Sequence, residues 1–267
     1  QEGLEDRGLR PRVGEAVAEG LPPMSWSLLA PIRKASDIAL GANVMRKRGL
    51  FDPLRPDQAL RSLVDAGRYG PFAAVIRHTA HTRPHAPAIV DEQGELTFAQ
   101  LDEYSNAFAH GLRTRGLRQG DVAAILARDH RGMVLSMLAT GKLGLRTVLM
   151  NTGFAKPQFA AVCERERVAV VLHDSEFTDL TSAIPDSVPR ILTWVDDPDD
   201  VDPNIPTLSS VSMGQPTTPP PAPSKSGGTV ILTSGTTGTP KGAPRDKVSP
   251  LMSAQFLDRG PLPRNGT

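Results

Sequence analysis

The 267-residue sequence has little cysteine, few aromatic residues and almost no net charge. Its single cysteine, Cys163, excludes an internal disulfide and fits a reducing, cytosolic setting. Aromatic residues make up 4% and the net charge is +1, so neither base stacking nor the overall charge points to nucleic acid. No run of 18 apolar residues occurs, and the first residues lack the basic and apolar regions of a secretory signal. We therefore expect a cytoplasmic protein that does not bind nucleic acid.

Hydrophobic residues make up 39% and charged residues 22%, as in a folded globular protein. Residues 1–23 are rich in Gly, Arg and Glu, which predicts a poorly ordered leader. Residues 24–69 are predicted to be an N-terminal helical extension. Within it, residues 24–50 mix apolar side chains with a basic set, Arg33, Lys34, Arg46, Lys47 and Arg48. Such a helix fits peripheral contact with a membrane, or packing on the main domain with its basic face in water.

From residue 86 onward, short apolar runs alternate with helical patterns. Strands are predicted at 88–90, 122–127, 147–150, 168–172, 191–195 and 229–232, and helices at 97–112, 131–143 and 156–167. Thr97 and Gln100 have the spacing of a capping box at the start of the first helix. Because most of these strands are apolar throughout, they indicate an α/β fold: a layered, largely parallel sheet with helices on both faces. The proline-rich stretch 196–226 is predicted to be loop.

The segment with the clearest chemistry follows the strand at 229–232. Residues 233–242 read TSGTTGTPKG, in which hydroxyl side chains alternate with glycines before a single lysine, Lys241. Glycines let a backbone approach a ligand closely, and a tight loop of exposed N–H groups forms an anion-binding concavity. Hydroxyl groups add donors, and the lysine adds positive charge. The spacing differs from that of a Walker A loop, which requires Gly-Lys-Ser/Thr.

This ten-residue string resembles the phosphate-loop signature of the adenylate-forming (AMP-binding) superfamily. Residues 96–106 (LTFAQLDEYSN) and the blocks 142–151 and 163–174 also resemble that family, most closely the actinobacterial long-chain fatty acyl-CoA synthetases. The resemblance covers residues 70–267, which would be the first part of the AMP-binding large domain. It implies that this N-terminal large domain is incomplete, because the family's later motifs do not follow Gly242.

The resemblance implies a reaction in two steps. A fatty acid attacks the α-phosphate of Mg-ATP to give acyl-AMP, and the thiol of CoA then displaces AMP. ATP, Mg²⁺ and CoA are thus the implied ligands, with the CoA site outside this chain. The implied ATP-binding residues are Thr233, Ser234, Gly235, Thr236, Thr237, Gly238, Thr239 and Lys241. They act by positioning and charge neutralisation, so no catalytic acid or base is assigned.

The absence of the later motifs leaves three functions open. The chain could contribute the ATP-binding half of a fatty acid–CoA ligase, with little activity alone. It could instead be an inactive or split-gene remnant that binds a complementary C-terminal half, or an acyl-AMP ligase that passes the acyl group to a carrier protein.

Two further residue groups carry weaker signals. His78, His81 and His85 suggest a metal site, but Pro84 interrupts the helical spacing and no site is assigned. Cys163 falls on the apolar side of a predicted helix, which favours a buried, inert thiol.

Overall fold

The computed structural model describes residues 56–197, 202–233 and 241–244. These residues form a six-stranded sheet in the order β6-β5-β3-β4-β7-β8, together with a separate antiparallel hairpin of β1 and β2. The first five strands of that order pair in parallel, and β8 is antiparallel to β7. The large sheet consists of β3 (Val122–Leu126), β4 (Arg146–Leu149), β5 (Val168–Asp174), β6 (Arg190–Trp194), β7 (Thr229–Thr233) and β8 (Lys241–Pro244).

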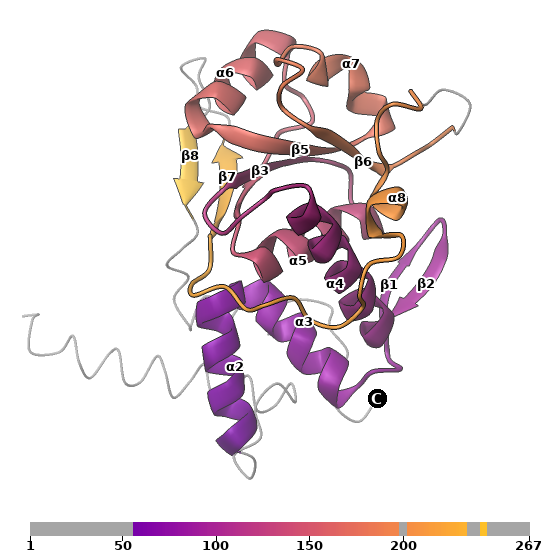
Figure 1. Cartoon of the computed structure of the whole chain (residues 1–267), viewed down its shortest axis with the longest axis vertical. Helices are drawn as coiled ribbons and strands as arrows, with labels where there is room; N and C mark the ends of the chain where they lie inside the picture. Colours follow the sequence, from indigo (N-terminus) through magenta and orange to yellow (C-terminus); the bar gives the residue numbers. More distant parts are fainter. Residues whose placement is uncertain (1–55, 198–201, 234–240, 245–267) are drawn as a thin grey trace, which may run out of the picture.

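Helices cover both faces of the sheet and form a further layer on one side (Figure 1). On one face lie α6 (Lys156–Glu166), the 3-10 turn η1 (Ser175–Phe177) and α7 (Thr178–Thr181). On the other face lie α4 (Phe98–Thr114), α5 (Arg131–Leu143) and α8 (Leu208–Ser212), and beyond them α2 (Pro56–Tyr69) and α3 (Pro71–Thr82). The small hairpin consists of β1 (Pro87–Asp91) and β2 (Gly94–Thr97). The expected α/β fold with a layered parallel sheet is confirmed.

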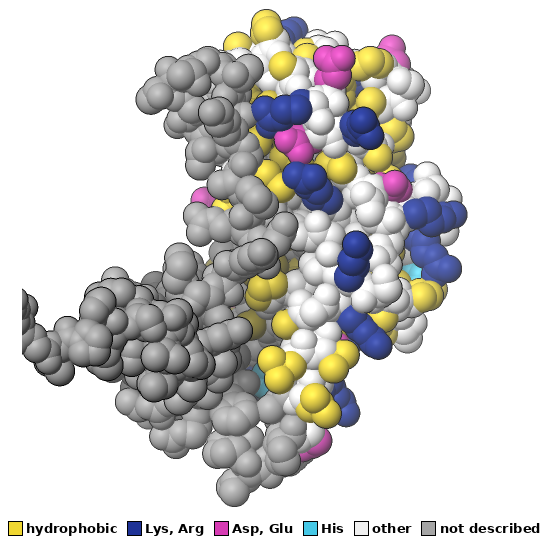
Figure 2. Space-filling view, turned by 90° about the vertical axis from the view of Figure 1, so that its left-hand side faces the viewer, with side chains coloured by type: hydrophobic (Ala, Val, Ile, Leu, Met, Phe, Trp, Pro, Cys, Tyr) yellow, Lys and Arg dark blue, Asp and Glu magenta, His cyan; other side chains and the backbone are white. Residues whose placement is uncertain are grey.

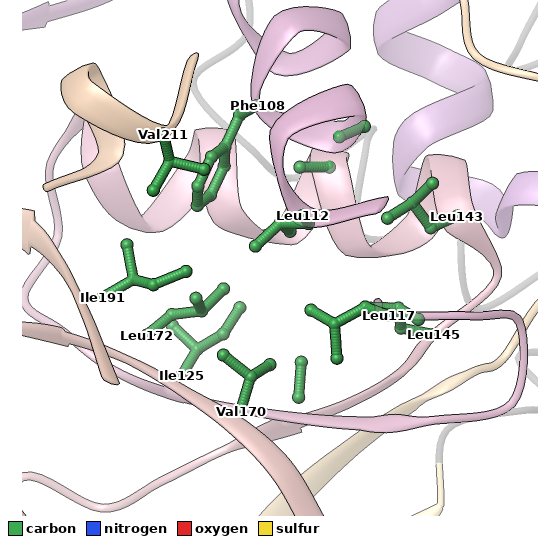
Figure 3. Packing of buried hydrophobic residues seen from close by; sticks show 13 residues of the cluster. Phe108, Leu112, Leu117, Ile125, Leu143, Leu145, Val170, Leu172, Ile191 and Val211 are labelled. Carbon is green, nitrogen blue, oxygen red and sulfur yellow. The ribbon is translucent and has the colours of Figure 1, made fainter. Parts of the chain in front are cut away.

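The central strand β3 explains why two cores form. Successive side chains of a strand point to opposite faces, so Ala123 and Ile125 enter one core while Ala124 and Leu126 enter the other. The first core joins the sheet to α4, α5 and α8, with Phe108 and Leu112 above Ile125 (Figure 3). The second joins it to α6 and η1. A strand that is buried on both faces must be apolar throughout, which is the pattern seen in the sequence.

Local sequence signals set the start of α4 and the end of α5. Thr97 accepts a hydrogen bond from the backbone N–H of Gln100, and the Gln100 side chain accepts one from the backbone N–H of Thr97. This confirms the predicted capping box. Gly144 caps the C-terminal end of α5 and adopts the left-handed conformation, at φ 68°, that glycine tolerates best.

The stretch 196–226 is not all loop, which corrects the prediction. Helix α8 lies within it, capped by Thr207, whose side chain accepts a hydrogen bond from the N–H of Ser210. Val211 of this helix is buried against α4 in the first core. A five-residue helix has too few positions to show a hydrophobic period, so tertiary packing decides its conformation.

The predicted leader at 1–23 and the basic segment at 24–50 lie outside the described residues. Helix α2 lies in the remainder of the predicted extension. None of the helices in the described ranges is long and apolar enough to cross a membrane.

Candidate functional site

The predicted phosphate loop connects the two strands of a hairpin. Strand β7 pairs in parallel with β4, and β8 folds back on β7 with Thr233 opposite Lys241. The two ends of the loop are therefore held side by side at the carboxyl end of β7. The residues between them, 234–240, lie outside the described part, so Ser234, Gly235, Thr236, Thr237, Gly238 and Thr239 remain predictions. Sequence reasoning treated Lys241 as part of the loop, whereas the structure places it at the start of β8.

The orientation of β7 is set by two of its side chains, which are buried on one face of the sheet. Val230 and Leu232 belong to the second core, while Ile231 points to the other face and is 39% exposed. The chain enters β7 close to the start of β4, where the N–H of Thr147 donates to the carbonyl of Gly228. A side chain on Gly227 would overlap the backbone of Leu145. This close approach requires glycine, so the segment before β7 fixes the register of the strand that carries the loop.

A second loop lies at the same edge of the sheet. Strand β4 is followed by Met150 and Asn151, and the Asn151 side chain accepts a hydrogen bond of 2.8 Å from the N–H of Gly153. Because β4 and β7 are adjacent and parallel, this turn and the phosphate loop both follow the carboxyl ends of neighbouring strands. In open α/β sheets, ligands bind at this edge.

A buried polar cluster lies at the carboxyl ends of the neighbouring strands β3, β5 and β6. Asp174, at the end of β5, accepts hydrogen bonds from the N–H of Arg128 at 2.7 Å and from the hydroxyl of Thr193 at 2.7 Å. It also contacts Nε2 of His130 at 2.9 Å. Nδ1 of His130 accepts from the N–H of Gly132 at the start of α5, so Nε2 carries the proton and donates to Asp174.

The Trp194 ring stacks on His130 with ring centroids 4.5 Å apart. Sequence reasoning missed this cluster, although polar residues directly after buried strands are a usable signal. Because the carboxylate of Asp174 is occupied by groups of the chain itself, the cluster ties together the ends of β3, β5 and β6.

The remaining sequence candidates lie away from this edge. Cys163 is 5% exposed on α6, and burial raises the pKa of its thiol to about 12, which fits the predicted inert thiol. His78 and His81 lie on α3, where Nδ1 of His78 is 3.3 Å from the Ser62 hydroxyl. Within the described ranges, no three histidine, cysteine or carboxylate side chains are grouped as a metal site would require.

Comparison with known proteins agrees with this architecture. The chain is 28% identical over 169 residues to a nonribosomal peptide synthetase of Aspergillus campestris, covering 63% of this chain and 2% of that protein. It is 26% identical over 177 residues to a 3-oxocholest-4-en-26-oate–CoA ligase of Rhodococcus rhodochrous, covering 64% and 32%. The crystal structure of an anthranilate CoA ligase with anthranoyl-AMP superposes with a TM-score of 0.59 at 23% identity, covering 65% and 34%.

The chain thus spans about a third of the length of the two CoA ligases and far less of the peptide synthetase. The profile of the AMP-binding enzyme family matches residues 76–257, which include both core clusters and the whole β7–β8 hairpin. With more than half of its residues matched, the chain belongs to the AMP-binding enzyme family, the adenylate-forming enzymes.

Proposed function

We propose that this chain provides the ATP-phosphate-binding part of a fatty acid–CoA ligase. The observation that supports it best is the β7–β8 hairpin, in which Thr233 and Lys241 face each other across the two strands. A hairpin closed in this way brings the two ends of the glycine-rich segment 234–240 close together. Glycines and hydroxyl residues between two such strand ends are the composition of an anion-binding loop.

In the proposed reaction, a carboxylate oxygen of the fatty acid attacks the α-phosphorus of ATP. The bond from that phosphorus to the bridging oxygen breaks, and pyrophosphate leaves with the electron pair. The loop residues and Lys241 would hold the β- and γ-phosphates and offset the charge that develops on the leaving group. Magnesium would arrive bound to the phosphates, and CoA would take the acyl group in the second step.

The fatty acid is the proposed substrate because of the sequence blocks described above and the relative from Rhodococcus rhodochrous. The name of that relative describes activation of a sterol-derived carboxylic acid, a large apolar acid. The peptide synthetase relative favours a second candidate, an enzyme that passes its acyl group to a carrier protein. The two candidates share the adenylation step and differ only in the thiol that accepts the acyl group.

The first test is fatty-acid-dependent exchange of pyrophosphate into ATP, with the chain alone and with an added C-terminal half from a related ligase. Lys241→Ala should abolish any exchange that occurs, because it removes the charge at the end of the loop. Lys156→Ala is the matched control, since Lys156 forms an exposed pair with Asp179 and should leave exchange unchanged.

The outcomes separate the candidates. Exchange only with the added half would identify this chain as one part of a split ligase, and the acceptor is then assigned by supplying CoA or a carrier protein. No exchange in either case, with no effect of ATP on thermal stability, would contradict the proposal and leave an inherited loop without a ligand.

A further inference from the structure

Helix α2 presents an apolar stripe to the outside of the protein. Leu60, Leu63 and Val64 are 65%, 72% and 43% exposed, although side chains of this kind are usually buried. Their spacing of three and four residues places them on one face of the helix. Figure 2 looks onto the side of the molecule that carries α2 and shows hydrophobic side chains at the surface of its lower part.

Contacts on the opposite side of α2 fix the direction of this stripe. Asp65 forms an ion pair with Arg77 of α3 at 3.3 Å, and the Ser62 hydroxyl lies 3.3 Å from Nδ1 of His78. Because these polar contacts hold the inner face of α2 on α3, the helix cannot turn its leucines inward without breaking them. Within the part of the chain that the structure describes, the stripe is therefore a fixed outer surface.

Two arginines lie along one flank of the stripe, preceded there by the exposed Asp57 in the first turn of the helix. Arg61 and Arg68 are both exposed and seven residues apart, which places them on the same side of the helix. Neither has an ion-pair partner among the residues that the structure describes. An apolar helix face bordered by arginine suits an anionic lipid surface, because the apolar side chains can contact acyl chains while the arginines contact the phosphates.

The apolar surface continues from α2 toward the phosphate-loop strand. Gly67, one turn after Leu63, lines a cavity of about 550 Å³ together with Phe72, Leu149 and Ile231. Ile231 belongs to β7. The match to the AMP-binding family begins at residue 76, after the end of α2 at Tyr69. The stripe thus lies outside the matched stretch, at the end of an apolar path that reaches β7.

We propose that α2 binds the protein to an anionic lipid surface. Leu60, Leu63 and Val64 insert below the headgroups, while Arg61 and Arg68 pair with lipid phosphates. The inference stands independently of the proposed ligase activity. If the chain activates an apolar acid, binding through α2 would bring β7 near the membrane into which such acids partition.

Flotation of the full chain with extruded vesicles tests the proposal. Vesicles of phosphatidylcholine with about a third phosphatidylglycerol should bind the protein, pure phosphatidylcholine should not, and added salt should weaken binding. The double variant Leu60→Ser, Leu63→Ser should bind at least about tenfold more weakly, because two inserted side chains are lost. Arg61→Gln and Arg68→Gln should each weaken binding roughly fivefold.

Val90→Ser is the matched control, because Val90 is 74% exposed on β1, away from α2, and its loss should leave binding unchanged. A fluorophore at Leu63→Cys, in a Cys163→Ala background, should shift to shorter wavelength on anionic vesicles. Circular dichroism verifies that each variant is folded.

Three outcomes would overturn the proposal. One is failure of the wild type to float. Another is full binding by the folded double serine variant, since residues before α2 would then suffice. The third is a dimer that sedimentation detects and the double variant loses, since a second copy of the chain would then cover the stripe.

Discussion

The ammonium group of Lys142 is fully buried between α5 and α4. It donates to the carbonyl and the carboxylate of Asp102, both at 2.8 Å, to the Ser105 hydroxyl at 2.7 Å and to the Asn106 amide oxygen at 2.6 Å. Burial lowers the pKa of Lys142 to about 8, and Asp102 opposes that shift, so the side chain stays charged at neutral pH. The sequence identified the blocks that contain these residues, but the contact between them depends on how α4 packs on α5.

Replacing Lys142 tests the strength of this contact. Lys142→Met should lower the free energy of unfolding by about 2–4 kcal/mol, because Asp102, Ser105 and Asn106 lose a charged donor inside the protein. Lys156→Met is the control: its 2.7 Å pair with Asp179 is exposed and should contribute less than about 1 kcal/mol. Urea denaturation of both variants measures the difference. Equal losses would show that burial adds nothing to the Lys142 contact.

At the scale of elements, α4 and α8 can pack closely because α4 has a glycine, with no side chain, at the point of contact. A methyl group added at Gly111 of α4 would overlap the carbonyl oxygen of Val211 in α8. Gly67 of α2 has nothing within 4 Å of the same added group. A helix is usually less stable with glycine than with alanine at an interior position. Replacing glycine by alanine should therefore stabilise the protein at Gly67 and destabilise it at Gly111.

Gly67→Ala should raise the free energy of unfolding by about 0.5–1 kcal/mol. Gly111→Ala should lower it by about 1–3 kcal/mol, because α8 must move from the core. Thermal denaturation monitored by circular dichroism compares the two variants with the wild type. Stabilisation by both would mean that α8 is held too loosely to resist the added methyl group.

The elements recovered from sequence are those with strong local signals. The capping box of Thr97 and Gln100 and the apolar runs of β3 and β5 define their elements without knowledge of the fold. Strand β8 has only four residues, two of them Gly242 and Pro244, which are poor strand formers. The segment is a strand because it pairs with β7, and its own sequence does not indicate one. The sequence predicted a phosphate loop directly after β7, and the ATP-binding role of that loop stays a prediction. The pairing of Lys241 opposite Thr233, which brings the two ends of the loop together, was not predictable.

On the scale of the whole molecule, an ion pair joins the small hairpin to the main domain. Nε of Arg131, at the start of α5, donates to the two carboxylate oxygens of Asp91 in β1 at 2.9 and 2.8 Å. These hydrogen bonds from Arg131 lower the pKa of Asp91 from 3.8 to about 2. The unfolded carboxyl thus gains its proton at higher pH than the folded one. The resulting stability is complete above about pH 4 and is lost as pH falls toward 2.

Arg131→Met should therefore be less stable than the wild type at pH 5 by about 2 kcal/mol. The difference between the two proteins should shrink as pH falls from about 4 to about 2. Urea unfolding at several pH values measures it. Asp91→Asn should show the same pattern, and the double variant should lose little more than either single one. A difference independent of pH would assign the effect of Arg131 to packing.

The β6 edge of the large sheet is partly covered by a segment already described in another role. At β6, the N–H of Leu192 donates to the carbonyl of Pro206, and Leu192 forms a bridge with Thr207 just before α8. The missed helix α8 therefore follows a short length of chain that covers an edge strand. An edge strand covered in this way is a poor template for a strand from another molecule, so α8 and the residues before it also protect the β6 edge from intermolecular pairing.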